Sequence, residues 1–174
     1  PLLWSQVESA PYRLRRVLAF LDPSRDLAGI GYQIHQSLIA LGSGGPLGRG
    51  FGRGQQKFGF LPEPHNDFIF AMIGEEWGLV GVAALVALYL AFALVGYRVA
   101  RQAPDLFGSL LAIGVTNLVV VQALLHMAVA TALAPATGVP LPLVSYGGTS
   151  MLTMMVGLGL VLNAHVNRDV RLRR

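Results

Sequence analysis

The sequence predicts an all-α polytopic membrane protein in which three transmembrane helices follow a large exterior loop with short amphipathic helices. Two features of the composition support this fold class: 53% of the 174 residues are hydrophobic and only 13% are charged, which is typical of a membrane protein. The third observation is that residues 106–167 contain no Asp, Glu, Lys or Arg. At roughly 20 residues per crossing, such a run can hold two spans.

Charged residues and prolines predict where each span begins and ends. A first span covers residues 68–98, and a short charged loop separates it from the charge-free run. Prolines at positions 135, 140 and 142 interrupt that run, because proline breaks a helix. The second and third spans are therefore predicted at residues 106–133 and 145–165.

The basic residues near the span ends predict the orientation, because Lys and Arg in short loops disfavour translocation across the membrane. Arg98 and Arg101 flank the first loop and four more arginines lie in residues 166–174, whereas residues 134–144 carry no charge. The tail and the first loop are therefore expected in the cytoplasm. Alternation places residues 1–67 outside, although they carry seven Lys or Arg against five Asp or Glu; long segments largely escape this rule.

In chain order, the predicted segments are the end of a preceding helix with the large exterior loop (1–67), a transmembrane helix (68–98), a cytoplasmic loop (99–105), a transmembrane helix (106–133), an exterior loop (134–144), a transmembrane helix (145–165) and a basic cytoplasmic tail (166–174).

Two short helices are predicted in the exterior segment. Residues 11–23 place leucines and valine at helical spacing opposite arginines, a pattern that lies in a membrane interface and attracts anionic headgroups. Simple anchoring explains the same pattern. A second helix is predicted over residues 32–41, ending at Gly42, since glycine commonly terminates helices.

A glycine-rich stretch, residues 42–58, carries Arg49, Arg53 and Lys57 at intervals of four. Glycine lets backbone amides approach an anion, and the cations add charge for a phosphate. A flexible linker is the alternative interpretation. Neither a Walker lysine nor a dinucleotide-binding glycine pattern is present, so no nucleotide site is expected, and an exterior loop is not expected to meet nucleic acid.

Acidic residues and a histidine gather where the first span begins, as Glu63, His65, Asp67, Glu75 and Glu76. Asp67 could simply cap the helix, or it could do chemistry at the membrane surface. Glu75 and Glu76 would lie roughly 12 Å further along the helix axis, where an unpaired carboxylate costs on the order of 2 to 3 kcal/mol. They could line a cavity, or pair with a basic residue from helices that this chain lacks.

On the same side, residues 145–150 (SYGGTS) are expected to open the last helix. Ser145, Gly147 and Gly148 could present backbone amides and a hydroxyl to a phosphate or a sugar, or serve close helix packing. In the middle span, Gln122 and His126 share a helix face and are expected to form hydrogen bonds inside the bundle. The chain has no cysteine, so it offers no disulfide and no thiolate metal site.

Several stretches resemble consecutive signature blocks of the SEDS family, which comprises the FtsW, RodA and SpoVE proteins of bacterial cell-wall synthesis. The blocks are GYQIHQSLIALGSGG, GQQKFGFLPEPHNDFIFAMIGEEWGLVG and PLPLVSYGGTS, in order and over nearly the whole chain. RRVLAFLDP and QKF lean toward the division-type FtsW branch. ATG before VPLP departs from the Thr-Lys-Gly of many FtsW proteins, and Asn66 replaces the usual Thr.

The resemblance implies a peptidoglycan glycosyltransferase that polymerises lipid II on the outer face of the bacterial cytoplasmic (inner) membrane, at the division septum. It implies that Asp67 is the catalytic residue, with Glu63, His65 and Lys57 as neighbours. Charge on the leaving pyrophosphate would be met by a divalent cation, Mg²⁺ or Mn²⁺, or by the cations of the glycine-rich stretch, and no organic cofactor is expected. Expected partners are the nascent glycan strand, membrane lipids, divisome proteins and a class B penicillin-binding protein.

The family fold has about ten transmembrane helices, so the resemblance places this chain at the C-terminal part of that fold, as a fragment or a truncated product. Three other interpretations stay open: an elongation-type RodA, a lipid II flippase in which Glu75 and Glu76 relay protons, and a non-enzymatic platform for the transpeptidase. Loss of polymerisation in Asp67→Ala would favour the enzyme.

Overall fold

The computed structural model describes residues 20, 29–54 and 68–172, and this part of the chain is helical without any strand. Its four helices are α3 (Ile30–Gly44), α4 (Ile69–Gln102), α5 (Leu106–Ala130) and α6 (Gly148–Leu172). The amphipathic helix expected over residues 11–23 lies outside the described residues except for Phe20. Two of the four helices, α4 and α5, are long and apolar enough to cross a membrane, while the apolar part of α6, Gly148–Ala164, is shorter.

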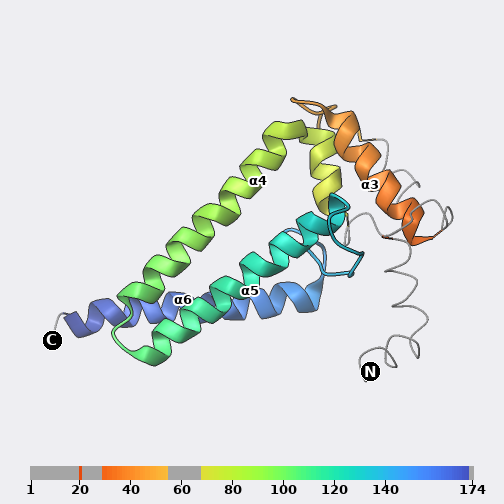
Figure 1. Cartoon of the computed structure of the whole chain (residues 1–174). Helices are drawn as coiled ribbons and strands as arrows, with labels where there is room; N and C mark the ends of the chain where they lie inside the picture. Colours follow the sequence, from red (N-terminus) through yellow and green to blue (C-terminus); the bar gives the residue numbers. More distant parts are fainter. Residues whose placement is uncertain (1–19, 21–28, 55–67, 173–174) are drawn as a thin grey trace, which may run out of the picture.

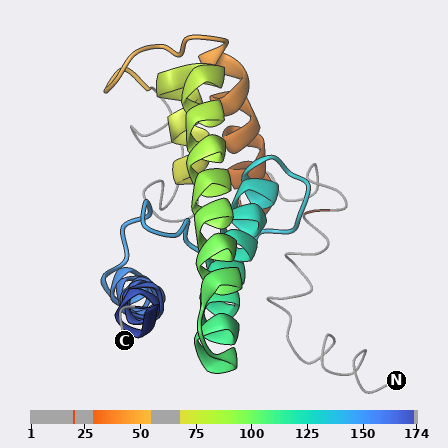
Figure 2. The same ribbon diagram turned by 90° about the vertical axis from the view of Figure 1, so that its left-hand side faces the viewer.

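The helices form a long hairpin with two flanking helices (Figure 1). α4 and α5 run antiparallel, and α6 turns back so that its end lies at the same end of the molecule as the α4–α5 turn. α3 lies beside the opposite end of α4, where its following loop arches over the helix (Figure 2). An all-helical arrangement with apolar helices agrees with the predicted fold class, whereas the count of three spans stays a prediction.

Local signals explain both ends of α5. Asp105 accepts a hydrogen bond from the Gly108 amide at 2.9 Å, which caps the start of α5. α5 ends at Ala130, three residues before the predicted end, because the chain turns there with Ala132 at a φ of 56°. α3 is longer than predicted at both ends, since Gly42 continues the helix to Gly44.

Two small apolar clusters hold the helices together. The first contains Ala40, Phe68, Ala71 and Val129, from α3, the start of α4 and the end of α5. The second joins the other ends of α4 and α5 to α6 through buried residues, namely Val99, Ala100, Ala112 and Val161. The first cluster therefore positions the end of the molecule that carries Glu75 and Glu76.

Close backbone approach also fixes the hairpin. A Cβ atom on Gly96 of α4 would lie 2.2 Å from the Thr116 Oγ1 atom of α5, so only glycine lets the two helices pack at this separation. At the α3 end, the buried Ser37 hydroxyl donates to the Ala130 carbonyl at 2.7 Å. These contacts make the α3, α4 and α5 ends one packed unit.

Candidate functional site

α4 is broken at Gly78, where φ is 64° and ψ is −157°. The sequence predicted one uninterrupted span here, and the structure shows two helical parts, residues 69–77 and 79–102, which meet at a bend (Figure 1). Such backbone angles are available almost only to glycine. Glycine inside an apolar run was therefore the signal for the break, because it weakens a helix at that position.

The loop after α3 satisfies the backbone groups that this break leaves without helical partners. Inside a membrane protein such groups must be paired internally. The four hydrogen bonds are Leu79 N to Gly45 O at 2.9 Å, Val80 N to Pro46 O at 3.3 Å, Arg49 N to Glu75 O at 3.0 Å and Gly50 N to Glu76 O at 3.0 Å. Residues 45–50 are thus bound to α4 on both sides of the break, which argues against the flexible-linker interpretation for this part of the glycine-rich stretch.

Glycine is required on both sides of this contact. A Cβ on Gly48 would lie 2.2 Å from the Glu76 carbonyl oxygen, and a Cβ on Gly78 would lie 2.3 Å from the Gly48 nitrogen. At the end of α3, a Cβ on Gly44 would lie 1.9 Å from the Gly74 carbonyl oxygen. Gly44 and Gly48 of this stretch therefore serve backbone-to-backbone packing against α4.

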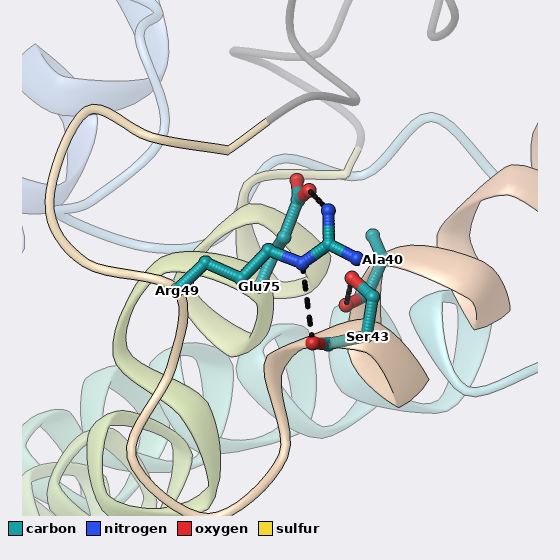
Figure 3. A network of polar contacts seen from close by, with 4 residues as sticks. All are labelled: Ala40, Ser43, Arg49 and Glu75. Carbon is teal, nitrogen blue, oxygen red and sulfur yellow. Dashed lines mark hydrogen bonds and ion pairs between the residues drawn. The ribbon is translucent and has the colours of Figure 1, made fainter.

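The Glu75 carboxylate is buried, with 1% exposure, and pairs with Arg49 at 3.7 Å between Oε1 and Nη1. Figure 3 shows the guanidinium between this carboxylate and the last turn of α3, where its Nε donates to the Ser43 carbonyl at 3.3 Å. The expectation that Glu75 needs a partner from helices absent in this chain is therefore wrong. Sequence spacing could not reveal this pair, because it depends on how the loop folds over α4.

Glu76 is partly buried beside the same loop. Gly54 is buried against both carboxylates: a Cβ on it would lie 3.0 Å from Glu75 Oε2 and 3.3 Å from Glu76 Oε1. Arg53, by contrast, is exposed. Of the expected cations, the structure brings Arg49 to the carboxylates and leaves Arg53 at the surface.

An apolar groove of about 510 Å³ runs beside Glu76 along α4. Phe51 and Trp77 line it with their rings edge to face, the centroids 6.4 Å apart. Sequence reasoning did not identify these two aromatic residues. Along α4 the groove continues past Ala84 to Leu88 and is bordered by Val144 from the loop before α6.

The residues expected to open the last helix lie differently from the prediction. α6 begins at Gly148, whereas Ser145 is buried in the preceding turn and its hydroxyl accepts from the Leu141 amide at 2.8 Å. A Cβ on Gly148 would meet no atom within 4 Å, and on Gly147 only the Ser150 Cβ at 3.6 Å. Close helix packing therefore does not explain either glycine within the described residues.

Gln122 and His126 of α5 hold the loop that leads to this turn. Gln122 Nε2 donates to the Pro140 carbonyl at 3.1 Å, and His126 Nδ1 lies 2.8 Å from the Val139 carbonyl. The expected hydrogen bonds therefore form, and their partners are loop carbonyls, so they position the 139–140 backbone.

Four candidate residues, Lys57, Glu63, His65 and Asp67, lie outside the described residues. Phe68, which follows Asp67 in the sequence, is buried in the first apolar cluster. Among the described residues, no three His, Asp or Glu side chains lie together in a way that could hold a metal ion. The residues that the structure places around Glu75 and Glu76 therefore do not by themselves form a metal centre.

Comparisons with known proteins show the family of this chain. A family model for the FtsW, RodA and SpoVE cell cycle proteins matches residues 1–170. The chain is 46% identical over 163 residues to a probable peptidoglycan glycosyltransferase FtsW of Geobacter metallireducens, covering 94% of this chain and 44% of that protein. It is 45% identical to stage V sporulation protein E of Bacillus subtilis, covering 90% and 43%.

A further relative is the peptidoglycan glycosyltransferase MrdB of Escherichia coli K12, which is 43% identical over 98% of this chain and 46% of its own length. Among solved structures, a chain from work on the structural coordination of polymerization and crosslinking by a peptidoglycan synthase complex superimposes with a TM-score of 0.75 at 33% identity, covering 96% of this chain and 46% of that one. The chain thus spans less than half the length of these relatives. With its matched signature blocks and helical arrangement, this chain belongs to the FtsW, RodA and SpoVE family, the SEDS family.

Proposed function

We propose that this chain is the part of a peptidoglycan glycosyltransferase that carries the catalytic carboxylate, Asp67, and that the enzyme extends glycan strands from lipid II. Family membership supports the reaction class, and relatives that are 43 to 46% identical carry peptidoglycan glycosyltransferase names. The structural observation that carries the proposal is the apolar groove beside Glu76. A substrate with an isoprenoid tail and a polar head requires an apolar surface next to polar groups.

In the proposed reaction, Asp67 acts as general base on the 4-hydroxyl of the incoming N-acetylglucosamine. That oxygen attacks C1 of the lipid-linked N-acetylmuramic acid of the growing chain, its proton passes to Asp67, and the C1–O bond breaks with inversion. The electron pair leaves with undecaprenyl pyrophosphate. A positioned base typically contributes about 10² to 10⁴ in rate.

The remaining candidate residues have assisting roles in this proposal. Arg53 is exposed in the described loop and, with Lys57, is proposed to meet the pyrophosphate charge. Glu63 and His65 are proposed as neighbours of Asp67. A divalent cation, Mg²⁺ or Mn²⁺, is proposed to add positive charge at the leaving group; no step is assigned to it, because the described residues offer no cluster of three metal ligands.

Glu75, Glu76 and the start of α6 would complete the substrate cavity. The Glu75 carboxylate is paired with Arg49, so its part would be to hold the site together, whereas Glu76 borders the groove directly. Ser145, Gly147 and Gly148 lie just after Val144, which also lines the groove. Their proposed role is to contact the saccharide head from the loop side.

The cellular setting is proposed from the same sequence blocks. The division-type blocks favour septal synthesis in the bacterial inner membrane with the active site on the exterior face. The similar solved structure comes from a peptidoglycan synthase complex, which supports a class B penicillin-binding protein as the partner, together with divisome proteins. RodA-type elongation is the second candidate role. The FtsW, SpoVE and MrdB relatives are 46, 45 and 43% identical to this chain, so sequence identity does not separate the branches of the family.

The test is polymerisation of purified lipid II by the full protein, with Asp67→Asn compared with Asp105→Asn. Both substitutions remove one carboxylate charge, and Asn at position 105 keeps the cap at the start of α5. We expect the rate to fall about 10²-fold or more in Asp67→Asn and to stay unchanged in Asp105→Asn. Equal rates in the two variants would remove Asp67 from the mechanism. Lipid II transport without any glycan product in the unmodified protein would favour a flippase, and retained partner binding without either activity would favour a platform.

A further inference from the structure

We propose that Arg49 is a positioning residue and that residues 44–50 form a clamp on the break in α4. The clamp holds the short part of α4, residues 69–77, in one orientation relative to the rest of the helix. This short part carries Glu75 and Glu76 and begins two residues after Asp67. The effect on turnover rests on the proposed function; the clamp itself is tested separately from it.

The short part of α4 is held by packing along its length, where Phe70, Ala71 and Met72 are buried, and by contacts at its two ends. It has nine residues, and isolated helices shorter than about 12 to 15 residues are marginal in water. At its start, Phe68 is buried against α3 and α5. At its other end, four backbone hydrogen bonds to Gly45, Pro46, Arg49 and Gly50 tie the loop to both sides of the break. Opening the clamp would therefore free that end and let the short part change direction.

Arg49 joins three segments of the chain. Its amide donates to the Glu75 carbonyl, and its guanidinium faces the Glu75 carboxylate, so one residue contacts Glu75 through both backbone and side chain. The same guanidinium donates to Ser43 in the last turn of α3 (Figure 3). A planar guanidinium with several donors can serve both partners at once, whereas a lysine ammonium on its flexible stem fits this geometry less well.

Burial of the carboxylate makes the pair energetically important. Glu75 is 1% exposed while the Arg49 side chain is 40% exposed, so the pair lies between the surface and buried classes of ion pair. Removing the arginine charge leaves a buried carboxylate without its cation. We expect loss of the Arg49 charge to increase the population of the open clamp about tenfold. This effect lies between those typical of breaking a surface ion pair and a buried ion pair.

The clamp is tested by hydrogen exchange of the full protein in lipid nanodiscs, followed in peptides that cover residues 45–54 and 74–82. The variants are Arg49→Gln, the charge-keeping Arg49→Lys and the control Arg98→Gln, which removes the same charge from an exposed arginine at the other end of α4. We expect about tenfold faster exchange at the clamp in Arg49→Gln, a smaller increase in Arg49→Lys, and none in Arg98→Gln. Unchanged exchange in Arg49→Gln would overturn the clamp.

The positioning role is tested by lipid II polymerisation in the same preparations. A misdirected half-helix should lower kcat while KM for lipid II stays within about twofold, because the lost contact is internal to the protein. Arg49→Lys should recover most of kcat. If KM rises with normal exchange, Arg49 binds substrate and the inference is wrong. If the unmodified protein does not polymerise lipid II but Arg49→Gln exchanges faster, the clamp stands and the glycosyltransferase proposal falls.

Discussion

Substituting Gly78 by alanine should destabilise the protein far more than a glycine-to-alanine change usually does in a helix. The backbone at this position has a φ of 64° and a ψ of −157°, a conformation that costs a residue with a Cβ about 1 to 3 kcal/mol. The added Cβ would also lie 2.3 Å from the Gly48 nitrogen, 2.7 Å from the Gly45 carbonyl oxygen and 2.9 Å from the Leu47 carbonyl carbon.

All three of these atoms belong to the backbone, so no side chain can rotate away to make room. The loop must move instead, and it then loses some of the four hydrogen bonds across the break, each worth about 0.5 to 1.5 kcal/mol net. Together the conformational and hydrogen-bond terms give a loss of about 3 kcal/mol or more in the free energy of unfolding. For a chain of this size, that corresponds to a fall in Tm of at least about 6 °C.

The assay is thermal unfolding in detergent or nanodiscs, with Gly114→Ala as the matched control. Gly114 lies inside α5, and a Cβ there would meet no atom within 4 Å. Alanine favours a helix interior over glycine by roughly 0.5 to 1 kcal/mol, so the control should keep or slightly raise the Tm. If Gly78→Ala unfolds at the same temperature as Gly114→Ala, the description of the break as a glycine-dependent contact is wrong.

Three further predictions follow from the packing and the proposed chemistry. Gly96→Ala should lower the Tm because its Cβ would overlap Thr116, and adding Thr116→Ala should recover part of the loss; no recovery would contradict the close helix contact. Phe68→Ala should cost about 3 to 5 kcal/mol, because Phe68 is 1% exposed, whereas Phe107→Ala, at a position that is 74% exposed, should change the free energy of unfolding by less than about 0.5 kcal/mol. Finally, EDTA should slow lipid II polymerisation and added Mg²⁺ or Mn²⁺ should restore it; full activity in EDTA would exclude a catalytic divalent cation.

The helices themselves could be predicted from the sequence, because their signals are local. A long apolar run predicts a membrane helix wherever the rest of the chain lies. The boundary near 98–105 was predicted less well, because Arg98 and Arg101 lie inside α4 and only residues 103–105 separate it from α5. Boundaries shifted where the chain forms a turn next to a predicted helix end. Ser145 is an example: its hydroxyl pairs with Leu141 in a turn, so the last helix begins later, at Gly148.

For the candidate carboxylates too, some features could be predicted from the sequence and others could not. Their gathering at the start of an apolar run was visible in the sequence, and so was the family resemblance that singles out Asp67. The sequence did not reveal that Glu75 and Glu76 differ in surroundings, with Glu75 buried against Arg49 and Glu76 beside the groove. Neighbouring residues on a helix point in different directions, and the groups they meet come from other segments.

By itself, the sequence determined that this is a helical membrane chain of the SEDS family, since composition, apolar runs and signature blocks are properties of consecutive residues. Only the tertiary structure decided that residues 44–50 of the glycine-rich stretch form a backbone contact on a broken helix, and that Arg49 pairs with Glu75. Glycine permits phosphate binding, flexibility and close backbone packing alike. Which of these occurs depends on the atoms that lie opposite, and here they are the backbone groups on either side of Gly78.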